Sequence, residues 1–488
     1  MTLRELLAGL HGLAVHGADD VAVTGLALDS RRVRPGDAFF ALAGVRDDGA
    51  RFVPAAVAAG ARVVVGAPGT RAEGATVVEV PEPRLALAAM ACRFHGDPSR
   101  AMKVAAVTGT NGKTTTTYML EAVFTASGWS AGLVGTTGIR VAGEQRASAF
   151  TTPEAPELQA LLAEMRDRGV RAVAMEASSH ALAQRRTFGL ACDAAVFTNL
   201  SQDHLDYHGT MEAYLDAKLM LFDGRNGAAG KRATAVVNAD DPAAARVTAA
   251  AAAGGLQVVR FGAAGGADVR LEGVEPEPAG LRMRIAAGGA ARDVTLPMLG
   301  RFNAHNAAGA WACALALGAG SEAVERALAT FAGVPGRLET VAARPFAVVV
   351  DYAHTPDALE RTLAACREHA RGRVLCVFGC GGDRDRGKRP LMGAIAARLA
   401  DLAWVTNDNP RTEDPDAIAA GIVAGAPGGG LVTILDRRAA IAAALGEARE
   451  GDVLLVAGKG HETTQTIGSQ VLPFDDRAVA RELLGVTA

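Results

Sequence analysis

The hydrophobic positions of this chain fall into short continuous runs, many of them rich in valine and alanine, and helix-like stretches separate these runs. Such runs are typical of strands buried on both faces, and the intervening helices indicate βαβ units around a mostly parallel, doubly wound sheet. Ligands of such sheets bind beyond the carboxyl ends of the strands. The strands predicted in this way cover residues 104–107, 172–175, 194–198, 234–237, 346–350, 374–378, 402–406, 431–435 and 453–456.

The first 98 residues show a similar alternation without a phosphate-binding loop. We therefore expect this region to bind a ligand rather than to carry the chemistry, although a purely structural domain fits the pattern equally well. The strands predicted here cover residues 21–28, 38–42 and 62–66, and a helix covers residues 52–61. Further helices are predicted at residues 118–124, 214–222, 243–253 and 303–317, and the alanine-rich 243–253 is expected at the surface.

Length and composition narrow the class of protein. A chain of 488 residues is too long for one ordinary core, so about three domains are expected. Its 49% hydrophobic and 21% charged residues describe a folded chain rather than a disordered one, and a net charge of −3 gives no sign of a nucleic-acid surface. The six cysteines lack paired spacing, which favours reduced thiols over disulfides or a zinc site.

No targeting or membrane segment is evident. The amino-terminal stretch carries charges within its apolar pattern, and no uninterrupted apolar run reaches about 18 residues. We therefore expect a cytoplasmic protein without membrane insertion.

A glycine-broken turn follows the run at residues 104–107, and a helix-like segment comes after it. The turn reads Gly109-Thr-Asn-Gly-Lys-Thr114. Loop amides and the positive end of a helix dipole together favour an anion, and Lys113 adds a positive charge next to the outer phosphates. The Thr114 hydroxyl is placed to hold Mg²⁺. Only two residues separate the glycines, where the common pattern has four, so an ordinary turn stays an alternative; the flanking strand and helix favour a nucleoside triphosphate site.

Polar clusters follow two other predicted strands of this region. Glu176, at the end of one, is a natural second ligand for a metal ion, although a helix-capping carboxylate fits as well. His204 and His208 have the spacing of zinc ligands, but no third ligand pattern follows, so we expect His204 alone near Mg²⁺ or phosphate and His208 in a structural role. Lys218 lies on a predicted amphipathic helix, where the pattern by itself favours a surface lysine.

Four further clusters follow strands in the last third of the chain, and together they predict a substrate site. A glycine- and arginine-rich cluster at residues 379–389 suits anions, either phosphate or carboxylate. Asp408-Asn-Pro-Arg411 combines acidic, amide and guanidinium groups in one turn, which suits a zwitterion such as an amino acid, although a solvated Asn-Pro turn is the plain alternative. The other two clusters cover residues 351–357 and 458–462.

With these motifs, the chain resembles the Mur ligases, ATP-dependent enzymes that add amino acids during peptidoglycan synthesis. Ten ordered matches carry the resemblance, and each alone is weak. They are Asp29-Ser-Arg31, Gly109-Thr-Asn-Gly-Lys-Thr-Thr115, Thr151-Thr-Pro-Glu154, Glu176-Ala-Ser-Ser-His180, Asn306, Gly336-Arg-Leu-Glu339, Asp351-Tyr-Ala-His-Thr-Pro356, Gly381-Gly-Asp-Arg384, Asp408-Asn-Pro-Arg411 and Gly458-Lys-Gly-His-Glu462.

The resemblance implies three α/β domains. A UDP-substrate-binding domain would cover residues 1–98, and a central phosphate-loop ATP-binding domain with a mostly parallel sheet would cover residues 99–333. A Rossmann-like amino-acid-binding domain would cover residues 334–488. The implied ligands are small molecules, with ATP as co-substrate, and the chain is expected to act as a monomer without nucleic acid.

The resemblance also implies roles for individual residues. ATP would be bound by Gly109, Thr110, Asn111, Gly112, Lys113, Thr114, Thr115, Asn306, Arg337 and His354. The UDP-muramoyl-peptide would be bound by Leu28, Ser30, Thr151, Thr152, Ser178, Gln184 and Arg186. The incoming amino acid would be bound by Arg384, Asp408, Asn409, Pro410, Arg411, Gly458 and Glu462.

The same resemblance implies the catalytic set. Lys113, Glu176, His204 and Lys218 would carry it, and Thr114, Glu176, His204 and Lys218 would hold Mg²⁺. Lys218 would act as a carbamate, because the matching lysine of the family is carbamylated. Phe150 stands where some relatives carry asparagine, which weakens any claim of a side-chain contact there.

The implied reaction is a ligation through an acyl phosphate. Within the family, the Asp-Asn-Pro-Arg form is associated with meso-diaminopimelate, because a second carboxylate needs a cation and lysine would be repelled by one. The alternatives are a lysine-adding muramyl ligase, a folylpolyglutamate synthetase, and a phosphate-loop switch or motor that hydrolyses ATP without ligation.

Overall fold

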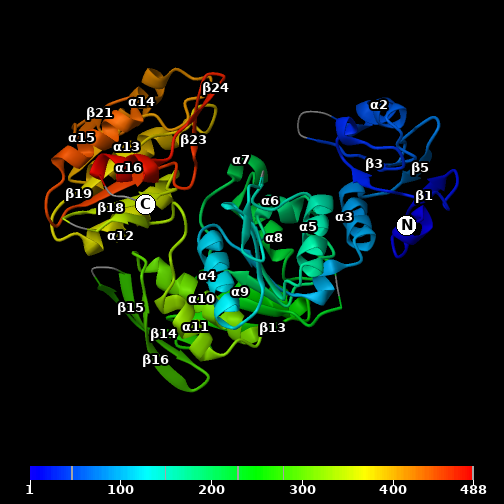
Figure 1. Ribbon diagram of the computed structural model, residues 1–488, viewed down its shortest axis with the longest axis horizontal. Helices are drawn as coiled ribbons and strands as arrows, with labels where there is room; N and C mark the ends of the chain where they lie inside the picture. The colour runs from blue at the N-terminus through cyan, green and yellow to red at the C-terminus, as the bar shows by residue number, and fades with distance from the viewer. Residues whose placement is uncertain (45–47, 149, 228–229, 278–279, 344, 486–488) are drawn as a thin grey trace. The chain divides into compact units, whose positions relative to one another are not determined.

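The computed structural model describes residues 1–44, 48–148, 150–227, 230–277, 280–343 and 345–485 (Figure 1). These residues form two compact units, one of residues 1–269 with 309–324 and the other of residues 270–308 with 325–488. The predicted α/β class with mostly parallel sheets is confirmed. Among the residues described, none of the helices has the length and apolar character needed to cross a bilayer.

The amino-terminal part of the first unit is a five-stranded sheet in the order β1-β5-β4-β3-β2, parallel except at β1. Successive side chains point to opposite faces, so Phe40 and Val65 pack toward α1 and α3 while Phe39 and Val64 pack toward α2. Its strands are β1 (Ala14–His16), β2 (Leu26–Ala27), β3 (Ala38–Ala41), β4 (Val63–Gly66) and β5 (Thr76–Glu79), and its helices are α1 (Leu3–Leu7), α2 (Val53–Ala58) and α3 (Pro83–Phe94).

The long strand predicted at residues 21–28 is wrong. Only β2 at its end joins the sheet, and Ala22 makes an isolated bridge to Thr2. The segment therefore runs beside α1, where Leu3 N donates to Val21 O and Val23 N donates to Met1 O. An apolar run predicts burial, and here Val23 is buried against α1 without continuing the sheet.

The central part of the first unit is built on parallel strands in the order β13-β12-β11-β6-β10-β7, followed by the antiparallel β8 and β9. Val104, Val173 and Phe197 share one core with α5 and α8, while α4 contacts β6, β7 and β10. The strands are β6 (Lys103–Thr108), β7 (Ala131–Gly135), β8 (Gly138–Val141), β9 (Glu144–Arg146), β10 (Ala172–Glu176), β11 (Ala194–Phe197), β12 (Thr234–Asn238) and β13 (Gln257–Gly262). The helices are α4 (Lys113–Ala126), α5 (Ala155–Asp167), α6 (Ser179–Ala183), α7 (Leu205–His208), α8 (Met211–Leu219) and α9 (Ala244–Ala253).

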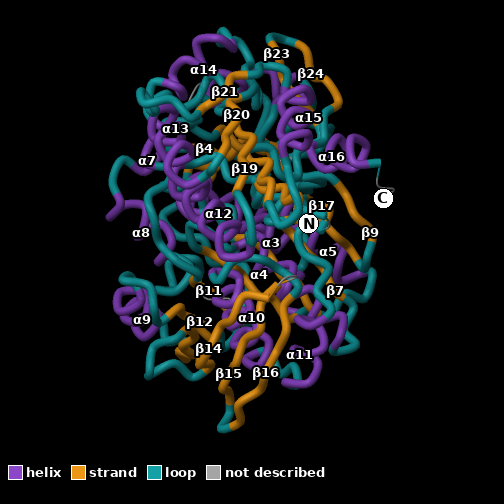
Figure 2. Tube along the Cα trace, turned by 90° about the vertical axis from the view of Figure 1, so that its left-hand side faces the viewer, coloured by secondary structure: helices purple, strands orange, loops and turns teal. Residues whose placement is uncertain are grey.

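Three long strands that the sequence analysis did not predict follow β13. They are β14 (Val269–Glu277), β15 (Gly280–Ala287) and β16 (Ala290–Leu296), and Figure 2 shows them side by side. β15 and β16 pair antiparallel, and Leu281, Met283 and Ile285 are buried while the residues between them are exposed. This strict alternation was the available signal, and it differs from the continuous apolar runs of the parallel strands.

The second unit contains a six-stranded sheet in the order β17-β18-β22-β19-β20-β21, parallel except at β17. Alternate residues of β18 and β19 form two cores: Val349 and Phe378 pack toward α12, α13 and α14, while Val350 and Val377 pack toward α15 and α16. The strands are β17 (Glu339–Ala342), β18 (Ala347–Asp351), β19 (Val374–Phe378), β20 (Leu402–Val405), β21 (Leu431–Thr433) and β22 (Val453–Ala457). A separate hairpin consists of β23 (Thr464–Ile467) and β24 (Gln470–Pro473).

Side-chain caps set where most helices of this unit begin. Thr355, Asp414, Asp436 and Asp475 each accept a hydrogen bond from an amide in the first turn of the helix that follows. Those helices are α12 (Pro356–His369), α14 (Pro415–Val423), α15 (Arg437–Glu447) and α16 (Asp476–Leu484), and α13 (Lys388–Leu399) begins without such a cap. Two further helices, α10 (Phe302–Ala316) and α11 (Ser321–Ala329), span the divisions between the two units along the chain, which fall after residues 308 and 324.

Helices α15 and α16 are joined by two ion pairs of opposite environments. Arg437 and Asp476 are both 0% exposed and form a bidentate pair at 2.7 Å. Arg438 directly follows Arg437, and Glu482 lies six residues after Asp476. Arg438 and Glu482 form a pair of similar length, 2.6 Å, at the surface. The two pairs therefore allow a buried and an exposed ion pair between the same two helices to be compared.

We predict that Asp476→Ala lowers the stability of this unit by about 3–5 kcal/mol, because it leaves a buried guanidinium without its counterion. The exposed control Glu482→Ala should cost at most about 1 kcal/mol. The thermal unfolding midpoint of each variant, measured by calorimetry, checks the difference. Equal shifts of the unfolding midpoint in the two variants would contradict the view that Asp476 stabilises the buried charge of Arg437.

Candidate active site

The predicted phosphate loop lies between β6 and α4. Gly109 and Gly112 both adopt positive φ, 144° and 85°, which glycine reaches without steric cost. Gly112 occupies the capping position of α4 and supplies no side-chain hydrogen bond, so no side chain covers the first amides of this helix at that point. Backbone amides of such a loop and helix N-terminus can donate to an anion, so the geometry is compatible with the predicted nucleotide site, which stays a prediction.

Residues at the end of β11 hold this loop in place. Asn199 accepts from the amide of Asn111 at 2.9 Å and donates its own amide to Asn111 O at 3.0 Å. Thr198 Oγ1 donates to the same carbonyl at 2.6 Å. A Cβ at Gly109 would lie 1.9 Å from Thr198 Oγ1, so the loop and the strand end fit only with glycine there.

Glu176 lies at the end of β10 and is fully buried, beside the start of α4. Thr114 Oγ1 donates to Glu176 Oε1 at 3.0 Å, and Thr136 donates to the same oxygen through its amide at 2.8 Å. The helix-capping alternative for Glu176 is wrong, because Ser178 caps α6. Thr136 was not among the predicted site residues, because no sequence motif marked it.

Lys218 is 1% exposed, so the surface position that the pattern alone favoured is wrong. Its Nζ donates to Gly109 O at 2.8 Å and lies over the ring of Tyr214. Lys113 Nζ donates to the same carbonyl oxygen at 3.0 Å and to Thr110 O at 2.8 Å. Burial, followed by the nearby charge of Lys113, holds the pKa of Lys218 well below that of an ordinary lysine, although Asp203 acts in the opposite direction.

The two histidines take different positions. His204 lies before α7 with φ of 53°, and its ring packs 4.7 Å from that of His180. Burial lowers the pKa of His204, and Lys113 and Lys218 contribute in the same direction. His208 Nε2 lies 3.0 Å from Ser179 Oγ and its ring packs against Tyr214, which suits the structural role predicted for it. Among the described residues no cluster of three histidine, cysteine, aspartate or glutamate side chains is arranged for a metal ion.

The residues predicted for the muramoyl-peptide lie together around the end of β10. Thr152 Oγ1 donates to Glu176 O at 2.8 Å and accepts from the amide of Ser178. Arg186 donates to Thr152 O at 3.0 Å and to Gln184 Oε1 at 2.7 Å. Arg186 also forms an ion pair with Glu154 and lies over the exposed ring of Phe150. Thr151 Oγ1 contacts Thr136 Oγ1 at 3.1 Å.

Leu28 and Ser30, predicted for the uridine end of the substrate, flank Asp29 after β2. Asp29 accepts from the amide of Arg31 and begins a short 3-10 helix at Ser30–Arg32. The Arg31 side chain, through its own hydrogen bond to Asp29, lowers the pKa of that carboxyl to about 2. Ser30 and Leu28 are partly exposed and are not part of the buried core.

In the second unit, the residues predicted for the amino acid gather at the ends of β20 and β22. Asn409 Nδ2 donates to Glu462 Oε2 at 2.9 Å, and a Cβ at Gly458 would lie 2.5 Å from Asp408 Oδ2. Burial raises the pKa of Asp408, opposed by Arg437. Asp408 Oδ2 is buried without a hydrogen-bond partner among the described residues.

The glycine- and arginine-rich loop that follows β19 packs against this turn. Gly382 N donates to Asn409 O at 2.9 Å, and Arg411 donates through its side chain to Gly382 O at 2.7 Å. Arg384 is exposed on the same loop. Lys459 is fully buried and donates to Glu462 Oε2 at 3.0 Å. It was not among the predicted site residues, although its place inside the Gly458–Glu462 motif was a signal for it.

Three residues predicted for ATP lie in the segments assigned to the second unit. Asn306 donates to Asn303 Oδ1 at 2.9 Å and is buried in α10. Arg337 lies over the ring of Tyr352, and its Nε is buried without a hydrogen-bond partner among the described residues. His354 Nδ1 lies 2.8 Å from Tyr352 O.

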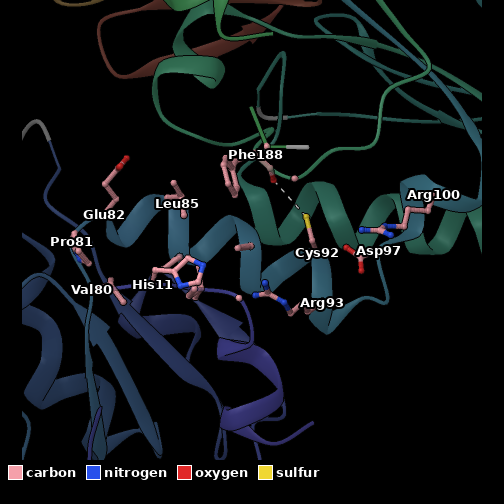
Figure 3. Close-up of a pocket in the computed structure, with 16 residues that line it drawn as sticks. His11, Val80, Pro81, Glu82, Leu85, Cys92, Arg93, Asp97, Arg100 and Phe188 are labelled. Atoms are coloured by element: carbon pink, nitrogen blue, oxygen red, sulfur yellow. Dashed lines mark hydrogen bonds between the residues drawn. The ribbon is translucent and has the colours of Figure 1, made fainter. Parts of the chain in front are cut away.

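A separate cavity of about 520 Å³ lies beside α3 in the first unit. Figure 3 shows Cys92, Arg93 and Phe188 around it, with Cys92 Sγ donating to Phe188 O at 3.5 Å. None of the residues predicted for a substrate lines this cavity.

Comparison with protein families gives three matches along the chain. The Mur ligase family, catalytic domain, matches residues 22–95, and the Mur ligase middle domain matches residues 107–314. The Mur ligase, glutamate ligase domain, matches residues 336–460.

Curated relatives match over nearly the whole length. A UDP-N-acetylmuramoyl-L-alanyl-D-glutamate–2,6-diaminopimelate ligase from Gloeobacter violaceus is 47% identical over 99% of this chain and 98% of its own. Proteins of the same name from Geobacillus thermodenitrificans and Mesorhizobium japonicum are 45% and 46% identical, each over 99% of both chains.

Solved structures agree in fold. A structure of a UDP-N-acetylmuramoyl-L-alanyl-D-glutamate–2,6-diaminopimelate ligase superimposes with a TM-score of 0.73 at 33% identity, covering 99% of both chains. A folylpolyglutamate synthase from Mycobacterium tuberculosis, complexed with ADP and AMPPCP, has a TM-score of 0.65 at 20% identity, over 83% of this chain and 96% of its own. The fold is therefore shared with the folylpolyglutamate synthetase alternative. Sequence identity distinguishes the two, because it is higher to the diaminopimelate ligase.

We predict that Gly109→Ala weakens nucleotide binding at least tenfold, because the added Cβ would collide with Thr198 Oγ1 and displace the loop. Gly265→Ala, where an added Cβ meets nothing within 4 Å, is the control and should bind as the parent chain does. Calorimetric titration with ADP measures both. Unchanged affinity in Gly109→Ala would show that this loop does not bind the nucleotide.

Proposed function

The chain belongs to the Mur ligase family, and on that basis we propose that it adds meso-diaminopimelate to UDP-N-acetylmuramoyl-L-Ala-D-Glu, with ATP as co-substrate, in peptidoglycan precursor synthesis. The observation that carries this proposal is the identity of 45–47% over essentially the full length to relatives that bear the diaminopimelate ligase name. The Asp408–Arg411 turn adds physical support, because a guanidinium suits the second carboxylate of diaminopimelate and would repel the ammonium of lysine.

The proposed reaction proceeds in two steps. The side-chain carboxylate of the D-glutamyl residue attacks the γ-phosphorus of ATP, so that an acyl phosphate forms and ADP leaves. The amine of diaminopimelate then attacks the acyl carbon, inorganic phosphate leaves, and the amine loses a proton. Since the first step brings two anions together, Lys113 at the phosphate loop would contribute mainly by neutralising charge.

The residues at the start of α4 fit a magnesium ion. Mg²⁺ prefers oxygen ligands and commonly binds through one or two carboxylates together with substrate phosphates. The Thr114 hydroxyl and the buried Glu176 carboxylate, 3.0 Å apart, offer such oxygens. The family resemblance adds His204 to this set. When bound there, Mg²⁺ would supply charge neutralisation at the phosphates.

The environment of Lys218 supports a carbamate there. Carbon dioxide reacts with a neutral amine, and the nitrogen loses a proton as the N–C bond forms, so a low pKa increases the reactive fraction. Burial and Lys113 hold the pKa of Lys218 low. Carbamylation would place an anion, instead of a second basic amine, beside Lys113, and it would provide oxygens for the metal ion.

The substrates would bind through the residues that the family resemblance assigns to them. Thr151, Thr152, Ser178, Gln184 and Arg186 would hold the muramoyl-peptide, with Leu28 and Ser30 at its uridine end. Arg384, the Asp408–Arg411 turn, Gly458 and Glu462 would hold diaminopimelate, and Asn306, Arg337 and His354 would contact ATP. We propose that the protein works on these small molecules as a cytoplasmic monomer, with domains 1–98, 99–333 and 334–488.

We predict that phosphate release requires ATP, the UDP-muramoyl-dipeptide and diaminopimelate together, because the amine is needed to consume the acyl phosphate. L-Lysine should replace diaminopimelate at least a hundredfold less efficiently in kcat/KM, since it lacks the distal carboxylate. A phosphate-release assay, with mass spectrometry of the product, measures both. ATP hydrolysis without an amino acid would favour a switch or motor, and equal use of the two amino acids would favour a ligase of different specificity.

We predict that Lys218→Ala loses at least a hundredfold in kcat and that acetate or formate partly restores it, because a free carboxylate can stand in for the carbamate. Lys103→Ala is the control, since Lys103 lies over the Trp129 ring at the start of β6, and it should remain active without any response to acetate. Full activity of Lys218→Ala would reject the carbamate.

A further inference from the structure

The hairpin of β23 and β24 is bound to the Asp408–Arg411 turn by a dense set of hydrogen bonds. The Gln465 side chain donates to Asp408 O at 3.0 Å and to Asn407 O at 3.3 Å. Thr466 N donates to Asn409 Oδ1 at 2.9 Å. Consecutive hairpin residues thus contact the backbone and one side chain of the turn.

The same hairpin surrounds the backbone of Arg411. Arg411 N donates to Thr466 O at 3.1 Å, and Gly468 N donates to Arg411 O at 2.7 Å, so Arg411 forms an isolated bridge with Ile467. Arg411 has a φ of +53°, a conformation that costs free energy for a residue with a side chain and persists only where surrounding contacts hold it. The hairpin provides two of those contacts, one on each side of the residue.

Core packing does not account for this hairpin. All four residues of β24 are exposed, including Val471 at 63%, and the two strands form a sheet of their own (Figure 1). An isolated two-stranded hairpin is marginally stable in water. On β23, by contrast, Gln465 is buried, and its amide points at the turn. The buried polar contacts of the hairpin are therefore directed to Asn407–Arg411.

We propose that the β23–β24 hairpin, through Gln465, is the positioning element of the amino-acid site and sets the preference for an amino acid with a second carboxylate. This inference rests on the proposed function, because it takes the Asp408–Arg411 turn as the site of diaminopimelate. A guanidinium recognises a carboxylate through directed hydrogen bonds, so a shift of the Arg411 backbone weakens that contact specifically. Lysine lacks the distal carboxylate and therefore loses less.

The test replaces Gln465 with methionine, which keeps the length and most of the volume but donates no hydrogen bond. We expect Gln465→Met to raise the KM for diaminopimelate on the order of tenfold, as the loss of buried hydrogen bonds does, with the KM values for ATP and the UDP-muramoyl-dipeptide within twofold of the parent. The ratio of kcat/KM for diaminopimelate to that for L-lysine should fall by a similar factor. Val471→Ala, on the facing strand, is the matched control and should change none of these values.

The outcomes distinguish a failure of the proposed function from a failure of the positioning inference. If the parent enzyme does not ligate diaminopimelate, the proposed function fails. If the parent does so but Gln465→Met keeps its KM and its preference over lysine, only the positioning inference fails. A rise in all three KM values together would indicate a general structural role and would also overturn it. Should Gln465→Met not fold, as judged by its unfolding midpoint, Gln465→Asn, which keeps the amide but has a shorter reach, must show the same selective rise.

Discussion

Two lysine ammonium groups share one carbonyl oxygen at the centre of the first unit. Lys113 and Lys218 both donate to Gly109 O, at 3.0 and 2.8 Å, although Lys218 is almost entirely buried. Burial of Lys218, followed by repulsion from the nearby charge of Lys113, holds the pKa of Lys218 well below that of an ordinary lysine. The arrangement favours any process that brings negative charge to the loop, whether a phosphate or a chemical change of Lys218. The buried carboxylate of Glu176 lies beside Thr114, at the start of α4, the helix that follows this loop.

A second constraint governs the other unit, where polar groups of the turns after β20 and β22 are buried together. Arg437 donates to Asn407 O and Ala457 O, which directly precede Asp408 and Gly458, while Asp476 balances its charge. Lys459 and the hairpin contribute from other sides. Buried polar networks of this kind are costly if incomplete and specific if satisfied, so they hold a turn in a conformation that Arg411 alone would rarely adopt.

Much of the fold and of the site could be predicted from the sequence because both rest on local signals. Apolar runs marked the parallel strands, and β19 has the bounds that its pattern predicted, since a strand buried on both faces needs apolar residues throughout. Glycines with positive φ and a following helix marked the phosphate loop. The antiparallel β15 and β16 were missed because their alternation of buried and exposed residues was not recognised. The strand at 21–28 was predicted too long because burial against α1 also needs apolar residues.

The sequence by itself determined the kinds of chemical group present and their order along the chain, because strands, turns and helix starts depend on neighbouring residues. Tertiary structure alone decided which of these groups meet. Lys218 looked like a surface lysine, since helical periodicity cannot tell which neighbour covers a face; packing of α8 in the core brought it to Gly109, more than a hundred residues earlier. Gln465 carried no motif at all, and only the fold of the hairpin turned its amide toward Asp408. Contacts between distant segments depend on how whole helices and strands pack together, and no local sequence pattern predicts that packing.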